Sequence, residues 1–102
     1  MIGSGIDAAS RPVIERRFRL QWEPAQNAHV LLYPEGMIKL NASAGEILKR
    51  CTGEASIGDI TADLERAFAT TGLAAEVLAF IELAIEKQWL VLPPAVQPAV
   101  RP

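Results

Sequence analysis

Few side chains in this 102-residue chain could carry out chemistry, because it holds one histidine, His29, and one cysteine, Cys51. A disulfide, a Cys-ligated iron–sulfur cluster or a zinc site built from several Cys and His ligands would each need more such residues. His29 lies in a short apolar run with no Ser or Cys arranged near it in sequence, so we expect a structural role rather than general-base catalysis. Cys51 lies on the apolar stripe of a predicted helix, where a buried, unreactive thiol is expected. The sequence therefore favours a binding module over an enzyme, with no catalytic residue, no metal and no cofactor.

The remaining polar residues add no catalytic motif. The phosphate-binding patterns GxxxxGK and GxGxxG are absent from the sequence. Asp59 and Asp63 share a helix face at a spacing typical of two solvated surface carboxylates. Charge is uneven, with +3 over residues 11–50 and −6 over residues 54–86 in a chain of net charge −2. This division could orient a charged partner, or it could be an ordinary solvated surface.

Three segments have the pattern of β-strands. Residues 17–23 alternate polar and apolar side chains, and residues 29–33 form a short apolar run. A Tyr-Pro-Glu-Gly turn then leads to residues 37–40, which we expect to pair back on the second strand as a hairpin. Lys39 is expected on the face opposite its two apolar neighbours, because side chains alternate along a strand.

Three helices are predicted to follow. The first helix is predicted to begin at Ser43, where the spacing of a capping box is found. This helix is predicted to end near Gly53. The second begins at Ser56 in the same way and is stopped at Gly72, and the third covers residues 74–87. Strands first and helices later favour an α+β domain with a three-stranded antiparallel sheet followed by a three-helix bundle.

The chain is long enough for one domain, which we place at residues 13–92. Residues 1–12 are expected to be a flexible N-terminal arm, and residues 93–102 a Pro-rich tail. There is no apolar run of about 18 residues that could cross a membrane, and the first ten residues lack the features of a secretion signal. A cytoplasmic protein without membrane contact is expected.

One long segment is specific enough to indicate a family. Residues 29–41 read HVLLYPEGMIKLN, and further matching positions are Ser43-Ala44, Glu46-Ile47-Leu48, Cys51, Gly53, Ile57 and the Trp89-Leu90 pair. On these residues the chain resembles PqqD, the pyrroloquinoline quinone biosynthesis protein D family, from roughly Arg11 to Val91. One departure is Gln88, where the family pattern has Gly. A Gln in a left-handed conformation would cost about 1 kcal/mol, so the third helix could end differently here.

The resemblance implies a winged-helix-like fold and a role as a peptide chaperone. Such proteins bind the ribosomally made precursor peptide PqqA and present it to the radical SAM enzyme PqqE. The family's peptide pairs with the third strand and lies in a groove beside the third helix. Carried over to this sequence, the peptide-binding strand consists of Gly36, Met37, Ile38, Lys39 and Leu40. The helical wheel adds a groove wall at Leu78, Ile81, Glu82 and Ile85.

Two other functions remain as alternatives. A winged-helix DNA-binding regulator would place its third helix in the major groove, yet that helix carries Glu76, Glu82 and Glu86 against Lys87, an unfavourable surface for phosphates. An enzyme acting through His29 is the third hypothesis. A free sheet edge could also pair with a second copy, so a homodimer stays open.

Overall fold

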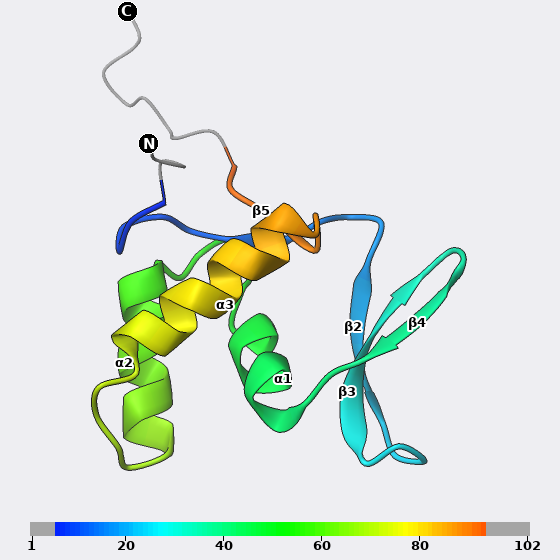
Figure 1. Ribbon diagram of the computed structural model, residues 1–102, viewed down its shortest axis with the longest axis horizontal. Helices are drawn as coiled ribbons and strands as arrows, with labels where there is room; N and C mark the ends of the chain where they lie inside the picture. The colour runs from blue at the N-terminus through cyan, green and yellow to red at the C-terminus, as the bar shows by residue number, and fades with distance from the viewer. Residues whose placement is uncertain (1–5, 94–102) are drawn as a thin grey trace, which may run out of the picture.

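A computed structural model describes residues 6–93 of the chain (Figure 1). The elements, in order, are β1 (Val13–Ile14), β2 (Arg19–Glu23), β3 (Ala28–Tyr33), β4 (Gly36–Lys39), α1 (Ala42–Lys49), α2 (Ile57–Ala67), α3 (Ala74–Glu86) and β5 (Leu90–Val91). Strands β2, β3 and β4 form an antiparallel sheet in that order, and the three helices follow it. The predicted α+β order is therefore confirmed.

The sheet stands to one side of the helices, with α1 next to it and α2 and α3 beyond (Figure 1). Leu20, Leu31 and Ile38 lie side by side across its three strands. Leu31 has no exposed surface, and the other two are partly buried against the core. This apolar face packs toward α1, while Lys39 lies on the exposed opposite face as predicted.

The start of α1 differs from the prediction. Its N-cap is Asn41, whose Oδ1 accepts a hydrogen bond from the Ala44 N–H at 2.7 Å. Ser43 lies inside the helix, and the Glu46 carboxylate accepts from Arg50 instead of reaching back to a cap. The predicted capping box at Ser43 is wrong because Asn41 reaches an orphan amide of the first turn two residues earlier.

The start of α2 is as predicted. The Asp59 N–H donates to Ser56 Oγ at 3.0 Å, and the Ser56 N–H donates to the Asp59 carboxylate at 3.1 Å, which completes a capping box. The end of α2 comes earlier than the predicted stop at Gly72. The helix ends at Ala67, and Ala69 takes the first left-handed conformation, with φ of 51°.

The end of α3 follows the glycine-type pattern although no glycine is there. The Trp89 N–H donates to the Ala84 carbonyl at 2.8 Å, and the Gln88 N–H donates to the Ile85 carbonyl at 2.9 Å. These two bonds form a Schellman motif, and Gln88 holds its left-handed position with φ of 66°. The substitution at Gln88 therefore strains the helix end without changing its geometry.

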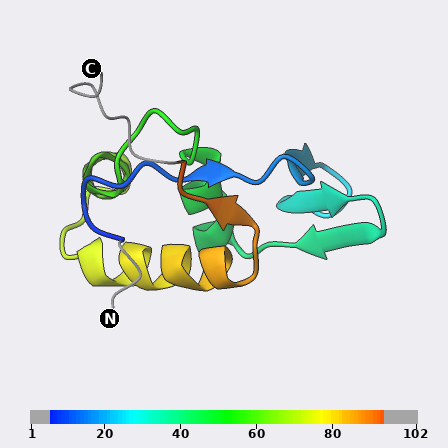
Figure 2. The same ribbon diagram turned by 90° about the horizontal axis from the view of Figure 1, so that it is seen from above.

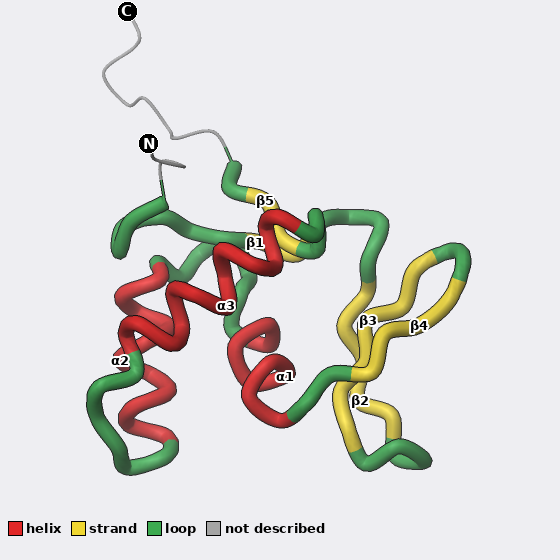
Figure 3. The backbone as a smooth tube through the Cα atoms, in the orientation of Figure 1, coloured by secondary structure: helices red, strands yellow, loops and turns green. Residues whose placement is uncertain are grey.

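Two short strands complete the fold. Val13 lies opposite Val91 and Ile14 opposite Leu90, so β1 and β5 form a second, two-stranded antiparallel sheet. Figure 2 shows this pair beside one end of α3, and Figure 3 shows how far it lies from the larger sheet. Neither of these two-residue strands is among the three strands predicted from the sequence.

The N-terminal segment is more ordered than expected. The carbonyls of Ala8, Ser10 and Pro12 accept hydrogen bonds from residues 58, 57 and 53, respectively, and Pro12 is buried. Residues 6–12 are therefore part of the folded domain rather than a flexible arm. The rest of that predicted arm, residues 1–5, and all of the predicted tail except Pro93 lie outside the described residues.

All layers contribute to one hydrophobic core. Its most deeply buried large side chains include Leu31 from the sheet, Leu48 from α1, Ile60 from α2, Ile81 from α3 and Leu90 from β5. Within residues 6–93, no helix combines the length and the apolar character needed to cross a bilayer.

Candidate functional site

The outer edge of β4 offers free backbone groups. Within residues 6–93, β4 pairs with β3 on one side only. The Leu40 N–H donates to the His29 carbonyl at 3.0 Å, which identifies the hydrogen-bonded pairs of this ladder. Because such pairs alternate in antiparallel strands, Ile38 bonds toward β3 while the N–H and C=O groups of Met37 and Lys39 point away from it. The edge can therefore accept an extended peptide as a fourth strand.

The side chains along β4 suit such an edge. Met37 is 46% exposed and Lys39 is exposed, so both are available next to an added strand. Ile38 and Leu40 point inward and anchor β4 on the core, where Leu40 is buried. Gly36 closes the hairpin opposite Tyr33, and a Cβ at this position would lie 3.3 Å from the tyrosine hydroxyl.

The other edge of the sheet, along β2, is less suitable. This strand carries the charged Arg19 and Glu23 and is followed at once by Pro24. Charged side chains and proline are common means of preventing strand addition. Lys39 is the single charged side chain of β4, so β4 is the more receptive edge.

The four residues predicted as a groove wall on α3 have different surroundings. Leu78 lines a hollow together with Ala8 and Gly58, on the flank of α3 that faces the N-terminal segment. Ile81 has no exposed surface and belongs to the core. Ile85 is partly buried on the same flank as Leu78, and Glu82 is exposed. Leu78 thus borders the N-terminal segment and Ile81 the core, and the assignment of all four residues to a groove wall stays a prediction.

The opposite flank of α3 is the one that faces α1 and, beyond it, the sheet. Leu73 and Glu76 on this flank line a hollow together with the first turn of α1. Phe80 and Leu83 continue the flank at helical spacing, Phe80 half-buried and Leu83 43% exposed. One residue in the sequence indicated this flank: Leu83 is apolar although it lies outside the apolar stripe that packs in the core.

A half-buried tryptophan extends this flank past the end of α3. Trp89 packs against the core, and the Lys87 ammonium lies 6.0 Å from the centre of its ring. The Trp89 carbonyl accepts from the Glu15 N–H at 2.8 Å, which fixes the segment relative to the end of β1. Aromatic side chains held in this way are common anchors in binding grooves.

The two residues with possible chemistry have structural environments. His29 packs edge-on against Trp22, with ring centres 5.1 Å apart, and lies against Gly45 of α1. Cys51 is buried, its thiol donates to the Ile47 carbonyl, and burial raises the pKa of this thiol to about 12. The prediction that Cys51 is buried is confirmed. The part of the chain that the structure describes contains no cluster of three or more potential metal-binding side chains.

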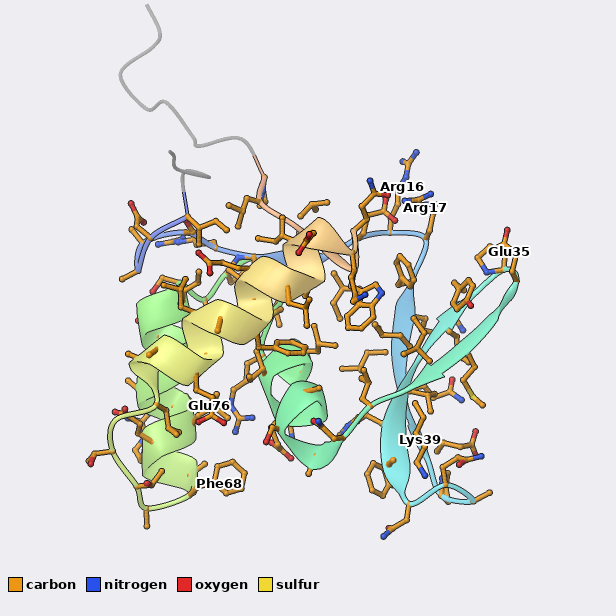
Figure 4. The ribbon with its side chains drawn as sticks, viewed as in Figure 1. Arg16, Arg17, Glu35, Lys39, Phe68 and Glu76 are labelled. Atoms are coloured by element: carbon orange, nitrogen blue, oxygen red, sulfur yellow. The ribbon has the colours of Figure 1, made fainter. Side chains whose placement is uncertain are left out.

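Basic residues gather near the tip of the β3–β4 hairpin. Figure 4 shows Arg16 and Arg17 at the same end of the sheet as Glu35, while Lys39 lies toward the other end. Arg17 pairs with Glu15 at 2.8 Å, and this hydrogen bond lowers the pKa of the Glu15 carboxyl. Arg16 is exposed and forms no ion pair among residues 6–93, so this corner can attract an acidic ligand.

Comparison with known proteins places this arrangement in a family. Residues 28–90 match the family described as Coenzyme PQQ synthesis protein D (PqqD), and they include the whole β3–β4 hairpin and all three helices. The chain belongs to the PqqD family. The resemblance drawn from the HVLLYPEGMIKLN segment is thereby confirmed.

Relatives and a solved structure agree with this assignment. The PqqA binding protein of Stutzerimonas stutzeri is 48% identical over 90 residues, which cover 87% of this chain and 98% of the relative. The PqqA binding protein of Azotobacter vinelandii is 52% identical over 82 residues, covering 79% and 89%. The solution NMR structure of the PqqD truncation of Methylobacterium extorquens PqqCD, described as a ribosomal-peptide recognition element, superposes with a TM-score of 0.72. It is 24% identical, and the match covers 86% of this chain and 96% of that one. At this identity it shows a shared fold.

Proposed function

We propose that this PqqD-family chain is a non-catalytic chaperone that binds the precursor peptide PqqA by strand addition and presents it to the radical SAM enzyme PqqE. The observation that carries the proposal is the free β4 edge, with the backbone groups of Met37 and Lys39 pointing outward, in a chain whose relatives are named PqqA binding proteins. Backbone hydrogen bonds give affinity with little demand on peptide sequence. A ribosomal precursor is made in the cytoplasm, which is where this chain would act.

We place the second wall of the peptide site on the flank of α3 that carries Phe80 and Leu83, because this flank faces α1 and the sheet beyond it. Leu83 offers an exposed apolar surface, and Phe80 and Trp89 offer partly exposed ones. The flank chosen from the helical wheel, with Leu78 and Ile85, faces the N-terminal segment instead. We therefore extend the proposed site to Leu83 and keep the Leu78 flank as the alternative to be tested.

Titration of the chain with synthetic PqqA is the direct test. Heat of binding and amide shift changes are expected at Met37, Lys39 and Leu83, and smaller changes at Leu78 and Ile85. A titration with neither heat nor shift changes would contradict the proposed function. Larger changes at Leu78 than at Leu83 would return the groove wall to the flank facing the N-terminal segment.

A pair of serine variants tests the apolar wall. Leu83→Ser is expected to weaken PqqA binding about tenfold, because about 1.4 kcal/mol of apolar contact corresponds to that factor. Val91→Ser is the matched control, since Val91 is 39% exposed on β5 and lies outside the proposed groove. Equal PqqA affinity of the two variants would remove Leu83 from the site.

Presentation to PqqE needs a separate measurement. Pull-down or sedimentation of the chain with PqqA and PqqE together is expected to show a ternary complex. Sedimentation of the chain alone reports whether it dimerises. If a dimer dissociates when PqqA is added, then the second copy and the peptide compete for the β4 edge.

A further inference from the structure

A second hollow with an apolar lining lies among the helices. It has a volume of about 300 Å³ between the first turns of α1 and α3 and the end of α2, and Ile47, Leu64 and Val77 contribute to its lining. Phe68 stands at its side and is 55% exposed, more than any other large apolar side chain in the described part of the chain. Core packing does not need an aromatic ring in this position. An exposed ring beside an apolar hollow is typical of a site that receives a partner's side chain.

The rim of this hollow is acidic. Glu46 lies on one side, where Arg50 at 2.8 Å and Lys49 at 3.4 Å already neutralise its carboxylate. Glu76 lies on the other side, is exposed, and has no ion pair among residues 6–93. The surrounding segment, residues 54–86, has a net charge of −6. A cationic side chain arriving at Glu76 would therefore be attracted both locally and by the field of the two helices.

The hollow is separate from the proposed peptide site. Figure 4 shows Phe68 and Glu76 on the far side of α1 from Lys39 of β4. Helix α1, whose inner face is buried in the core, stands between them as a rigid element. A peptide on the β4 edge would leave the hollow open, so two ligands could be bound at once.

From this geometry we infer that the hollow is a docking site for a protein segment that presents a bulky apolar side chain next to a Lys or Arg. The apolar side chain enters the hollow against Phe68, and the cation pairs with Glu76. The segment belongs to the enzyme that receives the peptide, because that partner must bind while the peptide is held on β4. This inference rests on the proposed function and adds to it a surface for the partner.

Two substitutions at the hollow test the inference. Phe68→Ser removes the exposed ring, and Glu76→Lys reverses the charge of the rim. Each has a matched control away from the hollow: Trp22→Ser removes a ring that is 49% exposed on β2, and Glu86→Lys reverses another exposed charge of α3. Thermal unfolding of all four variants checks that they are folded.

The measurement is the affinity of full-length PqqE for each variant already saturated with PqqA. Phe68→Ser and Glu76→Lys are expected to weaken PqqE binding at least fivefold, while their PqqA affinity and the two controls stay at the wild-type value. Added salt should reduce the effect of Glu76→Lys and leave that of Phe68→Ser unchanged.

Three outcomes would overturn the inference. In the first, both variants are folded and bind PqqE as the wild type does. In the second, they lose PqqA affinity, which would make the hollow part of the peptide site. In the third, they dissociate a dimer of the wild-type chain, which would make the occupant a second copy. Failure of the wild-type chain to bind PqqA at all is a different result and contradicts the proposed function instead.

Discussion

Gln88 occupies a left-handed backbone position at the end of α3 that is unfavourable for a residue with a Cβ. Its left-handed φ of 66° suits glycine, and the Schellman bonds around it keep it there. The left-handed conformation costs a residue with a Cβ roughly 1–2 kcal/mol, and glycine loses part of this advantage through its freer unfolded chain. We expect Gln88→Gly to raise the free energy of unfolding by about 1 kcal/mol, measured by urea denaturation.

Gln88→Ala is the control for this prediction, because alanine keeps the Cβ and so keeps the strain. It should unfold at nearly the wild-type urea concentration. If Gln88→Gly proves no more stable than Gln88→Ala, the strain assigned to this helix end is absent.

Gly45 marks a close contact between helix and sheet. A Cβ at this position would lie 2.8 Å from Nδ1 and 3.1 Å from Cβ of His29, closer than side chains approach without displacement. Gly45→Ala should therefore lower the free energy of unfolding by about 1–3 kcal/mol, as overpacking does, despite the better helix propensity of alanine. Gly58→Ala is the matched control in α2, because its Cβ would meet nothing closer than 3.4 Å. Equal urea midpoints for the two variants would mean that α1 can shift away from β3 at little cost.

At the scale of elements, hydrophobic periodicity predicted the three longer strands and the three helices. Alternation and helical spacing placed the three strands and three helices, because each pattern records which face is buried. The capping box at Ser56 was found, while the true cap of α1 at Asn41 was misplaced because two capping residues compete within three positions. Strands β1 and β5 have two residues each and no period of their own, so their pairing depends on tertiary structure.

The β4 edge can be tested with proline, which removes a backbone donor. Lys39→Pro deletes an N–H that points away from β3, so PqqA binding is expected to weaken at least tenfold while the sheet remains paired. Trp22→Pro is the control, because it deletes an outward N–H on the opposite edge along β2. Titration calorimetry with PqqA compares the two, after circular dichroism shows that both are folded. Unchanged affinity in a folded Lys39→Pro variant would exclude strand addition at β4.

Proline at Ile38 would be a poorer test, although the sequence alone suggests it as a way to weaken peptide binding and leave the helices folded. The N–H of Ile38 points toward β3, so proline there would break the hairpin itself. Which N–H groups are free depends on ladder register, and the sequence does not contain that information directly.

At the scale of the whole molecule, the same limit applies to the candidate site. Family resemblance led to β4, which lies at an edge of the sheet as strand addition requires. The helical wheel could not decide which flank of α3 faces the sheet. Leu78 and Ile85 widen the apolar stripe because the N-terminal segment packs beside them, and that segment was expected to be a flexible arm. A helical wheel shows how wide an apolar stripe is, but not which neighbouring segment covers each side of it.

The charge network that joins α1 to α2 should govern the acid stability of the whole domain. Arg50, at the end of α1, donates to Glu46 at 2.8 Å and to the carboxylate of Asp63 on α2. Hydrogen bonds from Arg50 lower the pKa of both carboxyls in the folded state. The unfolded chain therefore binds more protons, so this stabilisation is present above the ordinary carboxyl pKa values and is lost as pH falls through the lowered ones.

Arg50→Met should flatten the fall of unfolding free energy between about pH 5 and pH 3, measured by urea denaturation at each pH. Arg19→Met removes an exposed arginine without an ion pair in the described chain and should keep the wild-type slope. Identical slopes in the two variants would show that the Glu46–Arg50–Asp63 network does not link the helices in solution.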